Sequence, residues 1–326
     1  MTINKATAIG CSNIAFIKYW GNVDQALRIA ATPSLSMNLA DLTITATVHF
    51  DDTCQADTLI MNGEPTTGSA ADRVFQHLDL VRTKANITTP AIVETHSNFP
   101  AGAGIASSAA AFSALAVAGA KAAGLSLSES ELSVLARRGS GSASRSVPTG
   151  FCEWLAGGTD ETSYSTSIAE PTHWDLHDIV AIVDHGHKAV GSTGGHSIAD
   201  TSPLQACRVT SASDRFERCK EALLNRDFAT FGPIIEEDTT IMHCVMMTSQ
   251  PPLFYWSPAT FTVMQATAQW REDGLPVYFT IDAGPNVHLI CEAAYADQVE
   301  QAARVLPGVT DVLRSGVGGP TQLIGA

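Results

Sequence analysis

Apolar and polar positions follow two different periods along the first third of the chain. Residues 6–50 are typical of β structure, because the stretch ends in the strand-like alternation "LTITATVHF". Apolar residues at helical spacing over 71–86 predict a helix, and residues 91–100 predict a strand that runs into a loop. A glycine-containing loop then leads into an alanine-rich segment, which we expect to be a helix ending near Gly124.

The same two patterns continue along the rest of the chain. Residues 128–138 begin with Ser128 three positions before Glu131, and this capping-box spacing favours the start of a helix. A new β segment begins at about Asp178, and the chain closes with the strand "VYFTIDAG" and a strand–helix–strand unit. Between them, helical spacing predicts helices near 204–224, 227–247 and 258–273.

The chain of 326 residues is too long for one ordinary hydrophobic core, so its length indicates two packed domains or one large α/β domain. Strands and helices alternate in both halves, which predicts an α+β fold with a boundary near residue 178. We therefore expect two domains, residues 1–177 and residues 178–326.

The charge balance narrows the class of partner. A net charge of −14 disfavours general nucleic-acid binding, because the chain lacks a phosphate-neutralising surface, although a local pocket can still hold a small anion. Seven cysteines without CxxC spacing favour reduced thiols over a disulfide framework. The chain shows no signal-peptide pattern and no apolar run that could span a bilayer, so we expect a cytoplasmic protein without a membrane partner.

The strongest local feature is "PAGAGIASSAAAFSAL", residues 100–115. Small residues let the backbone approach an anion, and the loop runs into a helix whose first amides and dipole face that anion. Ser107 and Ser108 lie where hydroxyls can hold a phosphate oxygen or Mg²⁺. The motif is not a Walker A sequence, and on its own it also fits a tightly packed alanine helix.

A second polar stretch is "RRGSGSASRS", residues 137–146. We expect Ser140, Ser142 and Arg145 to project from a glycine-rich turn that leads into the start of another helix. Hydroxyls together with a guanidinium suit a carboxylate or a phosphate. Alone, the stretch also fits a surface loop with a solvated arginine.

A third stretch is "YFTIDAGPN", residues 278–286, in which Asp282 ends an apolar strand. A carboxylate there is desolvated, so it needs a cation such as Lys18 or Arg145 to stay ionised. A structural aspartate that caps the turn is the alternative.

Four segments together resemble the mevalonate diphosphate decarboxylase family: "NIAFIKYWG", "PAGAGIASSAAAFSAL", "GSGSASRS" and "IDAGPN" occur in its order and spacing. This family belongs to the GHMP superfamily, which includes galactokinase, homoserine kinase and mevalonate kinase. The resemblance runs from about residue 6 to the last strand. It implies a two-domain GHMP fold, with an ATP-binding N-terminal domain similar to the second domain of ribosomal protein S5 and a ferredoxin-like C-terminal domain.

The resemblance implies an ATP-dependent decarboxylase of the mevalonate pathway, in isoprenoid biosynthesis. Such enzymes use ATP and Mg²⁺ to phosphorylate the 3-hydroxyl of a 5-phosphorylated mevalonate, and the loss of phosphate and CO₂ then gives an alkene. Asp282 matches the aspartate that takes or orients the hydroxyl proton, and Lys18 matches the lysine that orients this hydroxyl and meets the developing charge. Arg145 matches the arginine that grips the C1 carboxylate.

The resemblance also implies binding positions. Substrate contacts fall on Asn13, Tyr19, Asn22, Ser140, Ser142, Ser192 and Thr193. The ATP phosphate loop falls on Ala101, Gly102, Ala103, Gly104, Ile105, Ala106, Ser107 and Ser108, with Ser108 on the Mg²⁺ side of the phosphates. The family commonly forms homodimers, so we expect a homodimer, with the aromatic stretch at 251–258 as packing or dimer surface.

Two departures from the family pattern bear on the substrate. Members that use the diphosphate usually have Lys-Tyr-Trp-Gly-Lys, but here the last position is Asn22, and Thr193 stands where some members have an arginine. Fewer cations compensate a diphosphate poorly, so we predict that the substrate is 5-phosphomevalonate and the product isopentenyl phosphate. The alternative is a diphosphomevalonate decarboxylase that makes isopentenyl diphosphate.

Five histidines gather between the two halves: His173, His177, His185, His187 and His196. Their spacing matches no common metal-ligand pattern, so solvated loop histidines are the simpler interpretation. An intermediate interpretation is that His187, Lys188 or His196 adds positive potential for the 5-phosphate.

Two rival functions remain. One is a kinase that stops after 3-phosphorylation, and it conflicts with the complete set of Asp282, Lys18 and Arg145. The other is a non-catalytic nucleotide-binding paralogue, and it conflicts with the intact serine-rich loop.

Overall fold

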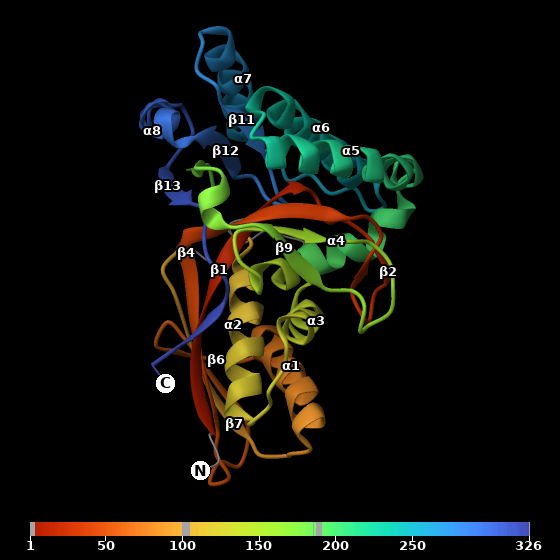
Figure 1. The fold of residues 1–326 in the computed structure, drawn as a ribbon, viewed down its shortest axis with the longest axis vertical. Coiled ribbons are helices and arrows are strands. Elements are labelled where there is room, and N and C mark those ends of the chain that lie inside the picture. Colours follow the sequence, from red (N-terminus) through yellow and green to blue (C-terminus); the bar gives the residue numbers. More distant parts are fainter. Residues whose placement is uncertain (1–3, 100–104, 185, 187–190, 326) are drawn as a thin grey trace.

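A computed structural model describes residues 4–99, 105–184, 186 and 191–325 (Figure 1). Two layered halves, each a sheet with helices, lie one above the other, and the long strand β1 runs from the lower half up to the junction (Figure 1). The α+β prediction is therefore confirmed.

The larger sheet has eight strands, in the order β14-β1-β4-β7-β5-β6, with β8 paired to β4 and β9 paired to β8. The strands β1 and β4 are its long antiparallel backbone, and the buried positions of β4 alternate as the sequence pattern predicts. The bounds are β1 Lys5–Ile17, β4 Ser34–Phe50, β5 Thr58–Met61, β6 Glu64–Thr66, β7 Ala91–Ser97, β8 Phe151–Trp154, β9 Ser165–Ala169 and β14 Gln322–Ile324.

Three helices pack against this sheet: α1 (Ser69–Ala85), α2 (Ser107–Ala122) and α3 (Glu129–Gly139). The alanine-rich α2 lies close to β1, because Gly10 leaves no room for a Cβ, which would come within 2.5 Å of the Ala110 carbonyl oxygen. The predicted capping box of α3 is present, so all three helix predictions in this half are confirmed.

The second sheet has four antiparallel strands in the order β11-β12-β10-β13. They are β10 Leu176–Ile182, β11 Tyr278–Thr280, β12 Val287–Glu292 and β13 Asp311–Gly316. The helices of this half are α5 (Gln205–Asn225), α6 (Phe228–Thr248), α7 (Pro258–Glu272) and α8 (Ala296–Arg304). The first three confirm the predicted helices to within two residues at each end.

Shorter elements complete the fold. A small hairpin pairs β2 (Asn22–Asp24) with β3 (Ile29–Ala30), a six-residue 3₁₀ segment η1 spans Gly141–Ser146, and α4 spans Ser192–Ile198. Three more 3₁₀ turns are η2 Pro171–His173, η3 Ala199–Thr201 and η4 Ala293–Tyr295. A regular helix does not follow the "RRGSGSASRS" turn, because the chain there tightens into η1.

The two halves share one hydrophobic core. It joins Phe16 and Met37 of the larger sheet with Trp174, Phe216 and Phe231 of the second half. At the other end of the chain, β14 pairs with β1 and so returns to the larger sheet. A domain boundary near residue 178 stays a prediction. Because β14 belongs to the larger sheet, the chain crosses from the second half back to the first after β13, which a single boundary does not describe.

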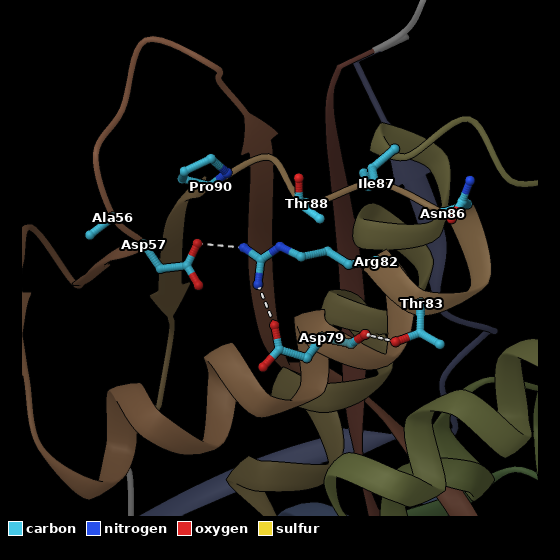
Figure 2. A pocket seen from close by; sticks show the side chains of 9 residues that line it. All are labelled: Ala56, Asp57, Asp79, Arg82, Thr83, Asn86, Ile87, Thr88 and Pro90. Atoms are coloured by element: carbon cyan, nitrogen blue, oxygen red, sulfur yellow. Dashed lines mark hydrogen bonds and ion pairs between the residues drawn. The ribbon is translucent and has the colours of Figure 1, made fainter.

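A cavity of about 640 Å³ lies beside α1 and is lined by a polar group centred on Arg82 (Figure 2). The guanidinium of Arg82 reaches Asp57 and Asp79, and its Nε donates to the Thr89 carbonyl oxygen at 3.0 Å. Two carboxylates already neutralise this cation, so the cavity offers no free positive charge for an anionic substrate. We interpret it as a structural ion-pair cluster that ties α1 to the strand ends.

Candidate active site

A second cavity, of about 550 Å³, lies at the junction of the two halves. It brings together side chains that are far apart in the sequence, including Lys18, Arg145 and Asp282, which we call the reaction centre. The predicted site residues on its wall are Lys18, Tyr19, Ala106, Ser107, Ser108, Ser140, Ser142, Arg145, Ser192, Thr193 and Asp282.

Other predicted site residues lie elsewhere. In the described part of the chain, Asn13, Asn22 and Ile105 are not among the lining residues. Asn13 and Asn22 nevertheless accept hydrogen bonds from two residues that do line the cavity, Arg145 and Tyr19. The predicted phosphate-loop residues Ala101, Gly102, Ala103 and Gly104 lie outside the described residues.

Lys18 and Asp282 form the central ion pair. The Nζ of Lys18 donates to an Asp282 carboxylate oxygen at 2.6 Å, with the Lys18 side chain 2% exposed and the Asp282 side chain 24% exposed. Burial lowers the pKa of Lys18, and the negative charges of Asp282 and Asp238 oppose that shift. The lysine is therefore hidden inside the protein, while the carboxylate keeps one side open to the cavity.

The environment keeps Asp282 ionised. Burial by itself would raise the pKa of this carboxyl, but the positive charges of Lys18, His288 and Arg145 bring it below its ordinary value. His288 is fully buried in β12, where its Nδ1 lies 2.7 Å from an oxygen of Asp178. That pairing raises the pKa of His288 despite its burial, so a second ion pair stands behind the first.

Helices of the second half fix the backbone of Lys18 from behind. The amide of Lys18 donates to Asp238 at 2.7 Å, and Asp238 in turn pairs with Arg215 at 3.0 Å. Arg208 donates to the carbonyl oxygen of Lys18 at 2.6 Å and to that of Trp20 at 3.0 Å. The strand carrying the lysine is thus held on α5 and α6, and Lys18 has few other positions available.

Asp282 lies two residues after the end of β11, and α6 also fixes this segment. The Thr239 hydroxyl donates to the Ile281 carbonyl oxygen at 2.7 Å and accepts the Ile281 amide at 3.0 Å. Burial lowers the pKa of the neighbouring His243 to about 3, so this imidazole stays neutral beside the ion pair. Helix α6 therefore contacts both the segment that carries Lys18 and the segment that carries Asp282.

Arg145 is oriented by the larger sheet. Its guanidinium donates to the Ser34 hydroxyl at 2.8 Å and to the Asn13 side-chain oxygen at 3.1 Å, and Asn13 also donates to Ser146 at 2.8 Å. Burial lowers the pKa of Arg145 to about 10, with the charge of Asp282 opposing the shift. The Nε of Arg145 is buried and has no hydrogen-bond partner among the described residues, while the Arg145 side chain contributes to the cavity wall.

The N-terminal end of α2 reaches the cavity. Ala106 precedes it in a left-handed conformation (φ 46°), and the Ser12 hydroxyl donates to the Ile105 carbonyl oxygen at 2.5 Å. The hydroxyls of Ser108 and Ser140 lie 3.1 Å apart. These oxygens and the ionised Asp282 in the same cavity form a hard donor set that fits Mg²⁺ carried by ATP phosphates.

Tyr19 lines the far end of the cavity and Asn22 supports it. The Tyr19 hydroxyl donates to the Asn22 side-chain oxygen at 2.5 Å, and the Asn22 amide donates to Gln25 at 2.8 Å. The His196 ring stacks on Tyr19 with ring centres 4.1 Å apart. A Cβ at Gly141 would come within 2.4 Å of the Tyr19 ring, so only glycine lets η1 pack there.

The predicted histidine cluster is not one group. His196 accepts the Gly21 amide at 3.0 Å, His173 lies 3.2 Å from the Leu223 carbonyl oxygen, and His177 accepts from Arg314 at 3.2 Å. His185, His187 and Lys188 lie outside the described residues. Within the described ranges, no three histidine, cysteine, aspartate or glutamate side chains gather as metal ligands.

Sequence reasoning missed several residues of the site. Arg28, Arg73 and Gln76 also line the cavity. A lone arginine in a hairpin or on a helix resembles a solvated surface charge, so nothing in the local pattern marks these positions. The supporting Arg208 and His288 were missed for a similar reason, because each fits the periodicity of its own element.

Two family models match the chain. The diphosphomevalonate decarboxylase-like N-terminal domain matches residues 10–165, and the mevalonate 5-diphosphate decarboxylase C-terminal domain matches residues 178–315.

Curated relatives carry two different names. The diphosphomevalonate decarboxylase of Candida albicans is 34% identical over 88% of this chain and 84% of its own length. The phosphomevalonate decarboxylase of Haloferax volcanii is 32% identical over 98% of both chains.

Solved structures share the fold over nearly the whole chain. The mevalonate diphosphate decarboxylase from Staphylococcus aureus superposes with a TM-score of 0.94 at 35% identity, covering 99% of this chain and 98% of that one. MDDEF in complex with MVAPP, AMPPCP and magnesium superposes with a TM-score of 0.93 at 34% identity, covering 99% of both chains. The predicted two-domain GHMP fold is confirmed.

Proposed function

This chain belongs to the diphosphomevalonate decarboxylase family, and we propose that it acts on the monophosphate, converting 5-phosphomevalonate to isopentenyl phosphate. Family membership makes it an ATP-dependent carboxy-lyase of the mevalonate pathway. The choice between monophosphate and diphosphate is the proposal.

One observation carries that choice: the residues expected at the 5-phosphate are neutral. Asn22 is buried and donates and accepts within the protein, to Gln25 and from Tyr19. Thr193 on the cavity wall adds a hydroxyl but no charge. A diphosphate carries more negative charge than a monophosphate, so its binding needs more cations than these positions supply. The relative from Haloferax volcanii, which covers this chain almost entirely, is a phosphomevalonate decarboxylase.

The reaction centre supports a division of roles. Asp282 accepts the proton of the 3-hydroxyl, because it is ionised and faces the cavity. Lys18 holds that carboxylate in place and meets negative charge that develops on the transferred phosphoryl group. Arg145 on the cavity wall binds the C1 carboxylate through its guanidinium group, which keeps the carboxylate oriented until CO₂ leaves.

The start of α2 is the expected position of the ATP phosphates, with Ser107 and Ser108 beside them. Bound Mg²⁺ would neutralise charge on the phosphates, and Ser108 is the residue we assign to it. After phosphoryl transfer, inorganic phosphate leaves C3, the C1–C2 bonding electrons form the alkene, and CO₂ departs.

The test is ATP-dependent CO₂ release with 5-phosphomevalonate and 5-diphosphomevalonate side by side, comparing kcat/KM. We expect a strong preference for the monophosphate. A preference for the diphosphate would overturn the substrate assignment and leave an ordinary diphosphomevalonate decarboxylase. ADP formation without CO₂ would indicate a 3-kinase, and nucleotide binding without turnover would indicate a binding paralogue.

We also propose that the chain is a cytoplasmic homodimer with a domain boundary at residue 178. Seven free cysteines fit a reducing compartment, and the exposed Phe254 (73% exposed) and Phe261 beside α7 offer apolar surface to a second copy. The N-terminal family model ends at residue 165 and the C-terminal one begins at 178. Light scattering on the purified chain tests the dimer, and a monomer at micromolar concentration would contradict it.

A further inference from the structure

Two arginines on the wall of the active-site cavity have no carboxylate partner. Arg28 lies in the β2–β3 hairpin, and Arg73 lies in the first turns of α1. Among the described residues, no carboxylate oxygen lies within 4.0 Å of either guanidinium. Several other arginines do have such partners, as Arg137 has in Asp160. The buried Arg145 and Arg208 instead donate to uncharged oxygens of the protein.

Among the residues that the structure describes, each arginine has a hydrogen bond at one nitrogen. The Nε of Arg28 donates to the Arg138 carbonyl oxygen at 3.0 Å, and an Nη of Arg73 donates to the Gly139 carbonyl oxygen at 3.3 Å. Successive carbonyl groups at the end of α3 therefore hold two like charges near each other. Partial desolvation and the charge of Arg28 lower the pKa of Arg73, so the pair is unfavourable without an anion.

The two arginines have different neighbours within the cavity. The Arg73 guanidinium lies 5.1 Å from the ring centre of Phe112 in α2, the helix whose N-terminal end carries Ser107 and Ser108. Its position therefore belongs with the ATP phosphates. Gln76, one turn further along α1, lines the cavity on the same side.

Arg28 lies instead with Tyr19. The charge of Arg28 is the strongest of those opposing the burial that raises the pKa of Tyr19. Its anchor, the Arg138 carbonyl oxygen, is two residues before Ser140, which lines the cavity. The hairpin that carries Arg28 begins at Asn22. Arg28 itself has a left-handed backbone conformation (φ 53°). This geometry is unfavourable for arginine, and proteins keep such strained residues at functional positions.

We propose that Arg28 binds the 5-phosphate of the substrate and supplies the positive charge that Asn22 and Thr193 lack. A single guanidinium with two free Nη groups matches one phosphate in bidentate geometry. Arg28 would then be a specificity-determining residue that favours one phosphate over two. The inference rests on the proposed function, because it assumes a phosphorylated mevalonate in this cavity.

The test compares Arg28→Gln with Arg73→Gln in ATP-dependent CO₂ release. Loss of one charge-assisted contact typically changes binding by about 10- to 100-fold. For Arg28→Gln we expect a rise of that size in KM for 5-phosphomevalonate, with KM for ATP unchanged. For Arg73→Gln we expect KM for ATP to rise instead. Arg28→Lys keeps the positive charge but not the bidentate geometry of the guanidinium group, so its KM for 5-phosphomevalonate should rise less than that of Arg28→Gln.

The outcomes separate this inference from the proposed function. A wild-type preference for the diphosphate overturns the monophosphate assignment, and the effect of Arg28→Gln on KM for the preferred substrate still decides the role of Arg28. An Arg28→Gln variant with the wild-type melting temperature and unchanged KM for both phosphorylated substrates overturns the inference alone. A rise only in KM for ATP overturns it as well.

A measurement on the unaltered protein covers the case in which Arg28→Gln does not fold. Phenylglyoxal modifies accessible guanidinium groups, and peptide mass spectrometry quantifies the modification at Arg28. We expect 5-phosphomevalonate to protect Arg28 when no nucleotide is present, whereas ATP alone protects Arg73. Equal modification of Arg28 with and without saturating 5-phosphomevalonate overturns the inference.

Discussion

At the reaction centre Lys18 and Asp282 neutralise each other, whereas elsewhere on the cavity wall Arg28 acts electrostatically on Tyr19, whose neutral hydroxyl donates to Asn22. We call this second region, Tyr19, Asn22, Arg28 and Thr193, the phosphate end. In the reaction centre each charge is fixed by a partner from another element. In the phosphate end Tyr19 and Asn22 bond to each other, and the Arg28 guanidinium has no carboxylate partner among the described residues.

This difference indicates which region can change in evolution without loss of catalysis. Lys18 is held at its side chain, its amide and its carbonyl group, so a substitution there disturbs the whole α5–α6 support. Asn22 lies in a three-residue strand and bonds to Tyr19 and to the exposed Gln25. Substrate preference can therefore be altered at the phosphate end while the reaction centre keeps its geometry.

The largest expected effect comes from Asp282→Asn, which breaks the reaction centre. The amide cannot accept the hydroxyl proton and leaves the buried Lys18 without its counter-charge, so we expect kcat to fall by about 10²- to 10⁴-fold. The ratio of kcat/KM between monophosphate and diphosphate should not change. CO₂ release with both substrates measures both quantities.

The matched control for Asp282→Asn is Asp214→Asn, which removes an exposed carboxylate on α5 and should leave kcat unchanged. If Asp282→Asn altered the substrate ratio more than it altered kcat, the separation between the two regions would be wrong.

A smaller effect is expected from Asn22→Lys, which adds charge to the phosphate end. The ammonium group would approach the second phosphate of a diphosphate, so kcat/KM for 5-diphosphomevalonate should rise by about tenfold, the equivalent of about 1.4 kcal/mol. The kcat with 5-phosphomevalonate should stay close to that of the unaltered chain. Steady-state kinetics with both substrates test this.

Val23→Lys is the control for that variant, because it adds the same charge to the same hairpin at a side chain that is 66% exposed. An equal gain from Val23→Lys would attribute the effect to general electrostatic attraction and would contradict a specific role for position 22.

The smallest effect concerns pH. Burial lowers the pKa of Lys18 below 10.5, so kcat should fall as pH rises through that lowered value and Lys18 loses its proton. Burial raises the pKa of Tyr19 to about 12, so Tyr19 does not contribute to this limb. Asp282 has a pKa below 3.8 and stays ionised at every pH above that value, so it gives no acidic limb near neutrality.

A pH profile of kcat with saturating substrates, from about pH 6 to about pH 11, covers the ordinary range of lysine titration and measures the alkaline limb. An apparent pKa at or above the ordinary lysine value would show that the ion pair with Asp282 outweighs the burial of Lys18.

Much of the fold could be predicted from local patterns. The capping box at Ser128 and Glu131 marks the start of α3 because its hydrogen bonds form between residues three apart. Strands β8 and β9 could not be predicted in this way. They are four and five residues long and lack a clear alternation, and their pairing depends on β4, which lies more than a hundred residues earlier.

The candidate site follows the same division. Lys18, Arg145 and Asp282 could be proposed because they stand in motifs that resemble a known family, and the structure brings all three to one cavity. Arg28 could not be proposed in this way, because the argument for it rests on the lack of a carboxylate partner among the described residues around it. Only the folded chain shows which arginines have carboxylate partners and which face the cavity without one.

The pairing of β14 with β1 has a consequence for biosynthesis. The β1 strand leaves the ribosome among the first residues, yet three of its positions, Thr7, Ala8 and Ile9, meet their partners only when residues 322–324 emerge. Until then, that edge of the nascent larger sheet is a strand with unpaired backbone groups, which is a surface prone to pairing with other chains. During translation, this edge is where a chaperone would be needed, and it becomes covered only when the last strand is added.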